Sequence, residues 1–147
     1  AKKDFGLISM SYGNIYVAKI ALAANPNQAV KAFMEAESYD GPSIIFAYTH
    51  CIAHGINMTN GVDEQKNAIA CGHWPLYRFD PRLKDEGKNP LQLDSKAPTI
   101  GFDEYAYNEN RYRSLKNAKP ERAAKLMEEA SKDAQNNYSI LEKLANL

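Results

Sequence analysis

The chain has little of what marks several large protein classes. It has only two cysteines among its 147 residues, too few for a disulfide scaffold, and their spacing matches no zinc motif. Lysine plus arginine total 18 and aspartate plus glutamate total 18, so no positive surplus favours nucleic acid or an anionic membrane. The apolar runs are too short to span a bilayer, and the first residues lack the apolar stretch of a signal peptide. We therefore expect a cytoplasmic protein with free thiols that binds neither nucleic acid nor membrane.

Common catalytic motifs are also missing. The sequence contains no P-loop, no Gly-x-Gly-x-x-Gly, no Gly-x-Ser-x-Gly, no His-Glu-x-x-His and no Cys-x-x-Cys. The first residue is Ala1 rather than methionine, which fits a cleaved or truncated product. Hydrophobic residues make up 44% of the chain, an ordinary value for a globular protein with a core of its own. Composition and motifs therefore predict one domain over residues 1–147 and no catalytic residue within it.

The first third of the chain alternates between helical and strand patterns. Residues 4–12 predict a helix, and the β-branched, apolar segment 15–20 predicts a strand. Asn25 followed by Pro26 predicts a helix start, since asparagine caps helices and proline suits the first helical position. Apolar residues then recur at helical spacing and predict one apolar face: Ala29, Val30, Phe33 and Met34.

A continuous apolar run at residues 43–48 predicts a second strand, buried on both faces of a parallel sheet. Residues 15–48 have the length of a right-handed βαβ crossover. Cys51 follows three residues after the second strand, at the sheet edge where open α/β sheets bind ligands. Its position alone leaves two readings open: a thiolate ligand or nucleophile, or a small buried hydrophobic residue.

The middle of the chain predicts shorter elements. Residues 63–71 predict a short helix, and the apolar, aromatic segments 74–79 and 90–93 predict two short strands. We expect these strands to be antiparallel to each other and to lie outside the parallel sheet. Pro75 and Pro90 favour a place at the sheet edge, because proline cannot donate a ladder hydrogen bond.

The last third predicts a helical tail. Residues 103–116 and 120–144 are the candidate helices, and the second carries a narrow apolar stripe of Ala123, Met127, Ala130, Ala134, Leu141 and Leu144. The expected fold is α/β: a βαβ unit with short peripheral strands and a helical carboxy-terminal tail. The predicted parts of the single domain are a βαβ core with its cysteine loop, a short helix with edge strands, and the tail: 1–62, 63–100 and 101–147.

Four long strings resemble the pyruvate:ferredoxin (or flavodoxin) oxidoreductases. They cover residues 1 to about 98 with little interruption, and strings of this length are more specific than a short motif. The family resemblance rests on Met10-Ser-Tyr-Gly-Asn-Ile-Tyr-Val-Ala18, Tyr39-Asp-Gly-Pro-Ser-Ile-Ile-Phe-Ala-Tyr-Thr-His-Cys-Ile-Ala-His-Gly55, Gly72-His-Trp-Pro-Leu-Tyr-Arg-Phe-Asp-Pro-Arg-Leu83 and Gly87-Lys-Asn-Pro-Leu-Gln-Leu-Asp-Ser-Lys-Ala-Pro98. The chain is similar to the carboxy-terminal part of the family's thiamine-diphosphate-binding domain.

The resemblance implies a fragment of a homodimeric enzyme with thiamine diphosphate, Mg²⁺ and [4Fe–4S] clusters. The family oxidises pyruvate with coenzyme A to acetyl-CoA and carbon dioxide, and passes electrons to ferredoxin or flavodoxin. The Gly-Asp-Gly segment that opens a thiamine diphosphate site is absent here, and the diphosphate and magnesium residues lie upstream in the family. We therefore expect no cofactor to bind to the chain alone, no activity in isolation, and the remainder of the polypeptide as its partner.

In the family, the cysteine of the string that contains Cys51 is the fourth ligand of the cluster nearest the thiamine, and the other three come from upstream. The resemblance thus implies Cys51 as a metal ligand. His50 and His54 flank it and are expected to be loop histidines, or to tune the cluster by hydrogen bonding. Cys71 matches no family ligand, so we expect a structural thiol. Arg78 and Arg82 are each expected to form a salt bridge within the fold rather than to meet an acidic partner.

Two alternatives stay open at this point. A related 2-oxoacid:ferredoxin oxidoreductase with a different keto acid would resemble the same strings, because the residues that select the acid lie mostly outside this chain. An interaction module with no catalytic role is the second alternative, and the missing cofactor motifs favour it. An upstream Gly-Asp-Gly segment and ferredoxin-like cysteines in the same reading frame would support the enzyme.

Overall fold

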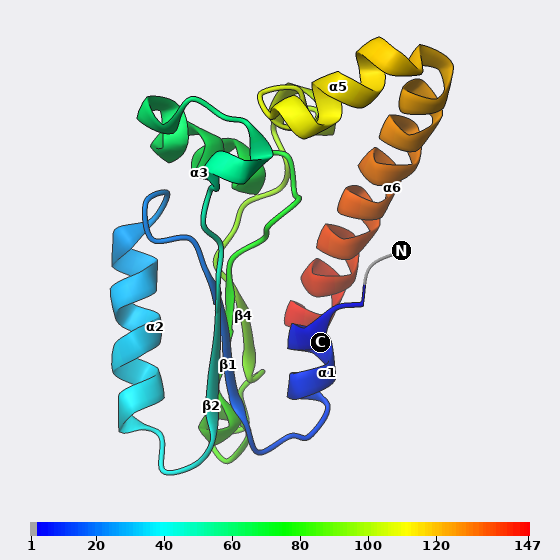
Figure 1. Ribbon diagram of the computed structural model, residues 1–147. Helices are drawn as coiled ribbons and strands as arrows, with labels where there is room; N and C mark the ends of the chain where they lie inside the picture. The colour runs from blue at the N-terminus through cyan, green and yellow to red at the C-terminus, as the bar shows by residue number, and fades with distance from the viewer. Residues whose placement is uncertain (1–2) are drawn as a thin grey trace.

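One four-stranded sheet organises the protein, in the order β2-β1-β3-β4 (Figure 1). The computed structural model describes residues 3–147. Strands β1 (Tyr16–Ile20) and β2 (Ser43–Ala47) pair in parallel, with Tyr16 opposite Ser43. Strands β3 (Tyr77–Phe79) and β4 (Leu91–Leu93) are antiparallel to their neighbours. The α/β fold with a βαβ unit and a helical tail is thereby confirmed.

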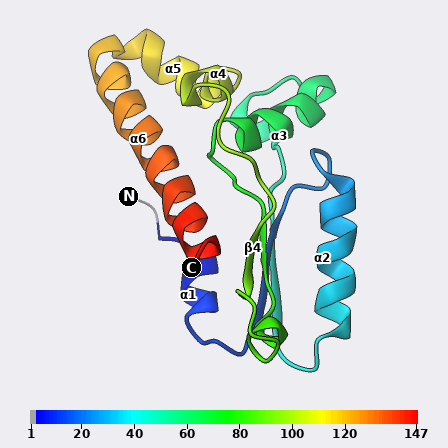
Figure 2. The same cartoon turned by 180° about the vertical axis from the view of Figure 1, so that it is seen from behind.

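Helices cover both faces of this sheet. Helix α2 (Pro26–Ser38) packs on one face, while α1 (Phe5–Met10) and the carboxy-terminal half of α6 (Pro120–Ala145) lie on the other (Figures 1 and 2). Beyond the carboxyl ends of β1 and β2 lie α3 (Gly61–Ala70), α4 (Phe102–Ala106) and α5 (Asn110–Ala118). No helix among residues 3–147 is both long and apolar enough to cross a membrane.

Local chemistry explains the βαβ unit. The side chain of Asn25 accepts a hydrogen bond from Gln28 N at 3.1 Å and caps α2, with Pro26 in its first position. Strand β1 is the inner parallel strand, and Tyr16, Val17 and Ala18 are fully buried. The crossover therefore forms where the sequence predicted it.

The prediction that the second strand is buried on both faces is wrong for β2. Ser43, Ile44 and Ala47 are exposed, and the other two residues of the strand are only partly buried. The reason is that β2 is the outer strand of the sheet and pairs with β1 alone. An apolar run can thus form an edge strand when no other strand among residues 3–147 pairs with its outer side.

Helix α2 also buries a different face from the predicted one. Ala29 is fully buried as expected, but Val30 is 55% exposed and Met34 is 68% exposed. Phe33 is exposed as well, and the residues packed on the sheet side are instead Gln28, Ala29 and Ala32. Small side chains let the helix lie close to β1, and the larger apolar ones point outward.

The two short strands belong to the main sheet rather than outside it. They are antiparallel to each other, as predicted, but β3 also pairs with β1, so Arg78 lies opposite Ala18. All three residues of β3 are buried, which makes it a central strand and not an edge. Pro75 precedes the ladder, so its missing N–H does not interrupt the pairing.

The tail is helical but has one more break than predicted. The expected helix over 103–116 is divided between α4 and α5, with Tyr107, Asn108 and Glu109 between them. Helix α6 buries four residues of its inner stripe: Ala123, Ala134, Tyr138 and Leu141. Leu144, the last residue of the predicted stripe, is exposed at the helix end.

Candidate functional site

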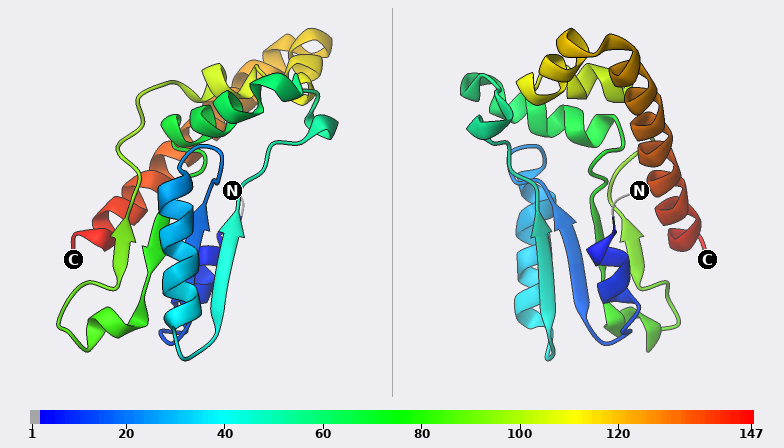
Figure 3. Two further views of the ribbon diagram at one scale, coloured as in Figure 1. Left: turned by 90° about the vertical axis from the view of Figure 1, so that its left-hand side faces the viewer. Right: turned by 45° about the vertical axis from the view of Figure 1, so that its right-hand side comes forward.

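The chain leaves the sheet after β2 and enters the segment that carries Cys51. Tyr48 N donates to Ile20 O at 2.9 Å, which extends the parallel pairing by one hydrogen bond. The following segment runs from the carboxyl end of β2 toward α3 (Figure 3). We call residues 48–55 the Cys51 loop. Its position at the carboxyl ends of two parallel strands is the place where open α/β sheets hold their ligands.

A short 3-10 helix, Ile52–His54, sets the conformation around the cysteine. His54 N donates to Cys51 O at 3.0 Å, and Gly55 N donates to Ile52 O at 2.9 Å. Gly55 ends the turn with a φ of 72°, a conformation that glycine adopts without strain. Cys51 itself is a free, partly buried thiol in an extended backbone conformation.

His50, on one side of Cys51, is held against helix α3. Its Nδ1 lies 3.1 Å from Gln65 Nε2, and Gln65 Oε1 accepts a hydrogen bond from Ala23 N at 3.1 Å. The imidazole ring also packs on the backbone of Gly61, where a Cβ atom would collide with it. Gln65 is buried, so this contact ties the loop to α3 and to the segment after β1.

His54, on the other side, faces the turn between α4 and α5. Its Nδ1 lies 3.5 Å from Glu109 Oε1, at ion-pair distance but without hydrogen-bond geometry. Asn110 N donates to Gly55 O at 3.2 Å, and a Cβ atom on Gly55 would collide with the Asn110 side chain. The loop is therefore in close contact with the tail on this side.

Glu109 is the fully buried acid of this region, with 0% exposure. Tyr105 OH donates to its Oε1 at 3.3 Å, and Arg111 Nε donates to its Oε2. The Tyr105 hydroxyl also lies 2.9 Å from the hydroxyl of Tyr48, in the Cys51 loop. Burial raises the pKa of Tyr48 to about 12, so both hydroxyls keep their protons at neutral pH.

A second acid, Glu64, lies in the same region and is 3% exposed. Burial, and next the nearby charge of Glu109, raise the pKa of Glu64 to about 7. Its Oε1 has no hydrogen-bond partner within the part of the chain that the structure describes. The region therefore holds two buried carboxyl groups, and near neutral pH one of them is partly protonated.

The second cysteine is not part of this loop. Cys71 follows α3, is 3% exposed, and its thiol donates to Ala68 O at 3.5 Å. Burial raises the pKa of Cys71 to about 11, as for a structural thiol in an apolar setting. Among residues 3–147, no three His, Cys, Asp or Glu side chains are grouped so that they could hold a metal ion. Cys51 therefore belongs to no group of three such side chains within the described chain.

Sequence reasoning found Cys51 but missed the two buried acids. Glu64 stands in the first turn of a helix, where an acid is ordinarily exposed and favoured by the helix dipole. Glu109 lies in the break between two helices that the sequence predicted as one. No local pattern marks either as buried, because their burial comes from packing between segments far apart in the chain.

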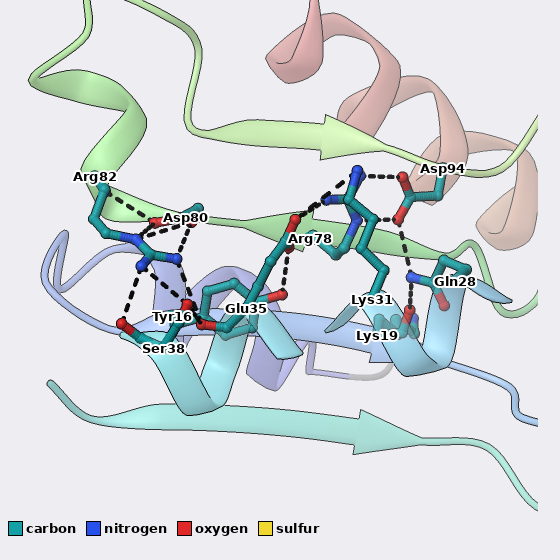
Figure 4. A network of polar contacts seen from close by, with 10 residues as sticks. All are labelled: Tyr16, Lys19, Gln28, Lys31, Glu35, Ser38, Arg78, Asp80, Arg82 and Asp94. Carbon is teal, nitrogen blue, oxygen red and sulfur yellow. Dashed lines mark hydrogen bonds and ion pairs between the residues drawn. The ribbon is translucent and has the colours of Figure 1, made fainter. Parts of the chain in front are cut away.

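A separate polar network lies between α2 and the sheet (Figure 4). Arg78 donates to Glu35 at 2.6 Å and to both oxygens of Asp94 at 2.9 and 2.8 Å. Tyr16 OH donates to Glu35, and Gln28 Nε2 donates to Asp94. The prediction that Arg78 forms a salt bridge within the fold is confirmed, and the same holds for Arg82, whose guanidinium pairs with Asp80.

Comparison with known proteins identifies the family. Pyruvate-flavodoxin oxidoreductase of Nostoc sp. is 51% identical over 145 residues, which are 99% of this chain. The chain belongs to the pyruvate-flavodoxin/ferredoxin oxidoreductase family. Pyruvate:ferredoxin oxidoreductase of Moorella thermoacetica is 51% identical over 98% of the chain. A protein named probable pyruvate-flavodoxin oxidoreductase of Escherichia coli is 47% identical over 99% of it.

The match covers only part of each relative. The chain spans about 12% of the length of the three proteins. No family model matches the chain. The relatives therefore show the family of this sequence, and each of them extends well beyond the part that it matches.

Proposed function

We propose that the chain is part of an oxidoreductase that converts pyruvate and coenzyme A to acetyl-CoA and carbon dioxide, with ferredoxin or flavodoxin as electron acceptor. The observation that supports this most is identity of 47–51% over nearly the whole chain to proteins named pyruvate-flavodoxin or pyruvate:ferredoxin oxidoreductase. Their names specify pyruvate, which favours pyruvate over another 2-oxoacid. Some relatives are named for flavodoxin and others for ferredoxin, so the names favour neither electron acceptor.

Within that enzyme, we assign Cys51 as one thiolate ligand of a [4Fe–4S] cluster. The free, partly buried thiol at the carboxyl end of β2 fits one ligand of a cluster shared between segments. It does not fit a cluster held by this chain alone, because no group of three ligating side chains lies among residues 3–147. When bound, such a cluster accepts and passes on single electrons. Cys71 is not assigned, because it is buried and its thiol faces Ala68 O.

The other cofactors are proposed to lie in the remainder of the polypeptide. Thiamine diphosphate and Mg²⁺ would be bound there, in a homodimeric cytoplasmic enzyme, and the chain alone would be inactive. We base this placement of the cofactors on the family resemblance and on the absence of a Gly-Asp-Gly segment from this sequence. The exposed apolar residues of α2 also suit a chain that packs against further sequence.

The test is Cys51→Ala in the complete oxidoreductase, with thiamine content, carbon dioxide release and carrier reduction measured side by side. We expect normal thiamine content and a loss of carrier reduction that exceeds the loss of carbon dioxide release. The reason is that Cys51 would serve the electron path and not the thiamine site.

Cys71→Ala is the matched control, because it removes the other thiol of the chain. It should keep carrier reduction close to wild type. Carrier reduction that survives Cys51→Ala would overturn the assignment of Cys51. No pyruvate-dependent activity in the complete wild-type protein would instead favour the interaction module.

A further inference from the structure

We propose that Gln65 and Glu109 are positioning residues that hold the Cys51 loop from its two sides. The inference rests on the proposed function, since it concerns how the proposed ligand is presented. Gln65 acts through His50 and Glu109 acts through His54, the two histidines that flank the cysteine. Neither Gln65 nor Glu109 is proposed to touch the cluster.

The need for such residues follows from the kind of segment that carries the cysteine. Loops are ordinarily the most mobile parts of a fold, whereas a metal ligand must be held close to its bound position. Only three residues separate His50 from His54. Fixing both histidines therefore leaves the backbone of Cys51 little freedom, and the 3-10 turn after it removes more.

On one side, the buried side-chain amide of Gln65 contacts both the Cys51 loop and the segment after β1. Its Nε2 meets His50 Nδ1 at 3.1 Å, and its Oε1 accepts from Ala23 N at 3.1 Å. Gly61 supplies the flat surface on which the ring of His50 rests. Because all three contacts come from helix α3 and the end of β1, this side anchors the loop to the rigid sheet.

The Glu109 side uses a charge that is costly to bury. A buried carboxylate stabilises a fold only when its partners are well placed, and an apolar side chain often serves as well. The partners of Glu109 are Arg111, Tyr105 and His54, and Tyr105 in turn meets Tyr48 of the Cys51 loop. Glu109 thus contacts the loop directly at His54, the last residue of the 3-10 turn, and reaches Tyr48, the first residue of the loop, through Tyr105.

A purely structural role for these residues predicts a different result from a positioning role. Loss of global stability speeds amide exchange throughout the core, whereas loss of positioning speeds it only where the loop opens. The amides of His54 and Gly55 report on the loop, because both are hydrogen-bonded in the turn. Buried strand β1 reports on the core.

The first experiment measures amide hydrogen exchange in the 147-residue chain for Gln65→Ala, Glu109→Ala and Glu109→Gln, with the surface variant Glu128→Gln as control. Loss of local stabilisation equal to one net hydrogen bond corresponds to roughly tenfold faster exchange, which we expect at His54 and Gly55 in the two alanine variants. Glu109→Gln keeps an acceptor for Tyr105 and should restore most of the protection. Exchange at β1 should stay at the wild-type rate.

Unchanged exchange at His54 and Gly55 in both alanine variants would overturn the proposal, and so would a uniform increase over β1 and the loop. If Glu109→Ala does not fold, Gln65→Ala and Glu109→Gln decide the matter. This experiment needs no cluster, so its outcome is independent of the proposed function.

The second experiment uses the complete oxidoreductase and reads the cluster by electron paramagnetic resonance and redox titration. Gln65→Ala should retain iron but broaden the signal or shift the midpoint potential, because the thiolate is held less uniformly. An unchanged spectrum and potential would contradict positioning. Iron retained in Cys51→Ala would instead contradict the proposed function, so the two failures are distinguishable.

Discussion

Two clusters of buried charged side chains in this protein differ in the segments that they hold together. Around Arg78, between α2 and the sheet, one buried cation meets the carboxylates of Glu35 and Asp94. Around Glu109, beyond the end of the sheet, Arg111 and His54 lie at ion-pair distance from that buried acid, and a second buried acid, Glu64, lies in the same region. Each cluster leaves one buried side-chain oxygen without a hydrogen-bond partner among residues 3–147, Gln28 Oε1 in the first and Glu64 Oε1 in the second, so the clusters differ mainly in which segments they contact.

The difference indicates different roles. The Arg78 cluster joins helix α2 to strands β1 and β3 (Figure 4), and the contacts described for it do not include the Cys51 loop. The Glu109 cluster reaches the loop itself, through Tyr48 and His54. We infer that the Arg78 cluster stabilises the fold, whereas the Glu109 cluster holds the loop that carries the proposed ligand.

The largest expected effect comes from breaking the Arg78 cluster. Arg78→Met leaves Glu35 and Asp94 without their buried cation, and removal of one partner from a buried ion pair costs about 3–5 kcal/mol. Urea unfolding of the chain measures the loss of unfolding free energy. The control is Arg82→Met, because the Arg82 side chain is 41% exposed and that of Arg78 is 7% exposed, so water screens its pair with Asp80 and its loss should cost clearly less. Similar losses in the two variants would refute the distinction.

A smaller effect, and one that depends on pH, is expected at Glu64. Its pKa is raised from 4.5 to about 7 by burial, so the folded state holds this proton more tightly than the unfolded state. The resulting stabilisation is fully present below about pH 4.5 and is lost as pH rises to about 7, by roughly 3 kcal/mol. Glu64→Gln should remove this pH-dependent loss.

The measurement for Glu64 is unfolding free energy as a function of pH in the wild type and in Glu64→Gln. Asp63→Asn is the matched control, because Asp63 is the exposed neighbouring acid. Its pH profile should run parallel to the wild type. A Glu64→Gln profile that also runs parallel would show that Glu64 does not retain its proton in the folded state.

Gly55 tests the contact between the loop and the tail. Gly55→Ala places a Cβ at a φ of 72° and against Asn110, so we expect a loss of about 2 kcal/mol. Gly87→Ala is the control: its φ is similar, at 68°, but its Cβ would meet no atom within 4 Å. That variant should lose about 1 kcal/mol from backbone strain alone. Thermal unfolding compares the two, and equal losses would argue against a close contact at Gly55.

The smallest effect is expected on the surface of α6. Glu128 and Lys132 form an exposed pair four residues apart, at 2.5 Å. Water and salt screen such pairs, so Glu128→Gln should unfold at the same urea concentration as the wild type. A clear shift of that midpoint would show that surface charge matters more here than in either buried cluster.

The parts of the fold that depend on local chemistry were predictable. The β-branched segment of β1, the Asn25 cap and the position of Cys51 after β2 all follow from neighbouring residues. The place of β3 inside the sheet was not, because its pairing with β1 joins residues far apart in the sequence. The burial of Glu109 escaped prediction for the same reason.

The exposure of apolar side chains on α2 was also not predictable from the sequence. Val30 and Met34 have the spacing of a buried face, yet the small residues Ala29 and Ala32 are the ones that pack against β1. Periodicity locates an apolar stripe but does not say whether the chain itself covers it. Cys51 has a similar status: its place was predictable, and its role as a ligand stays a prediction.

The most direct test of the central claim is the iron and sulfide content of the complete oxidoreductase in Cys51→Ala and Cys71→Ala, with electron paramagnetic resonance of the oxidised protein. The proposed assignment predicts that Cys51→Ala lowers iron content or gives a three-iron signal, because one iron loses its thiolate. Cys71→Ala should match the wild type. Full iron and an unchanged spectrum in Cys51→Ala would contradict the assignment of Cys51 as a cluster ligand.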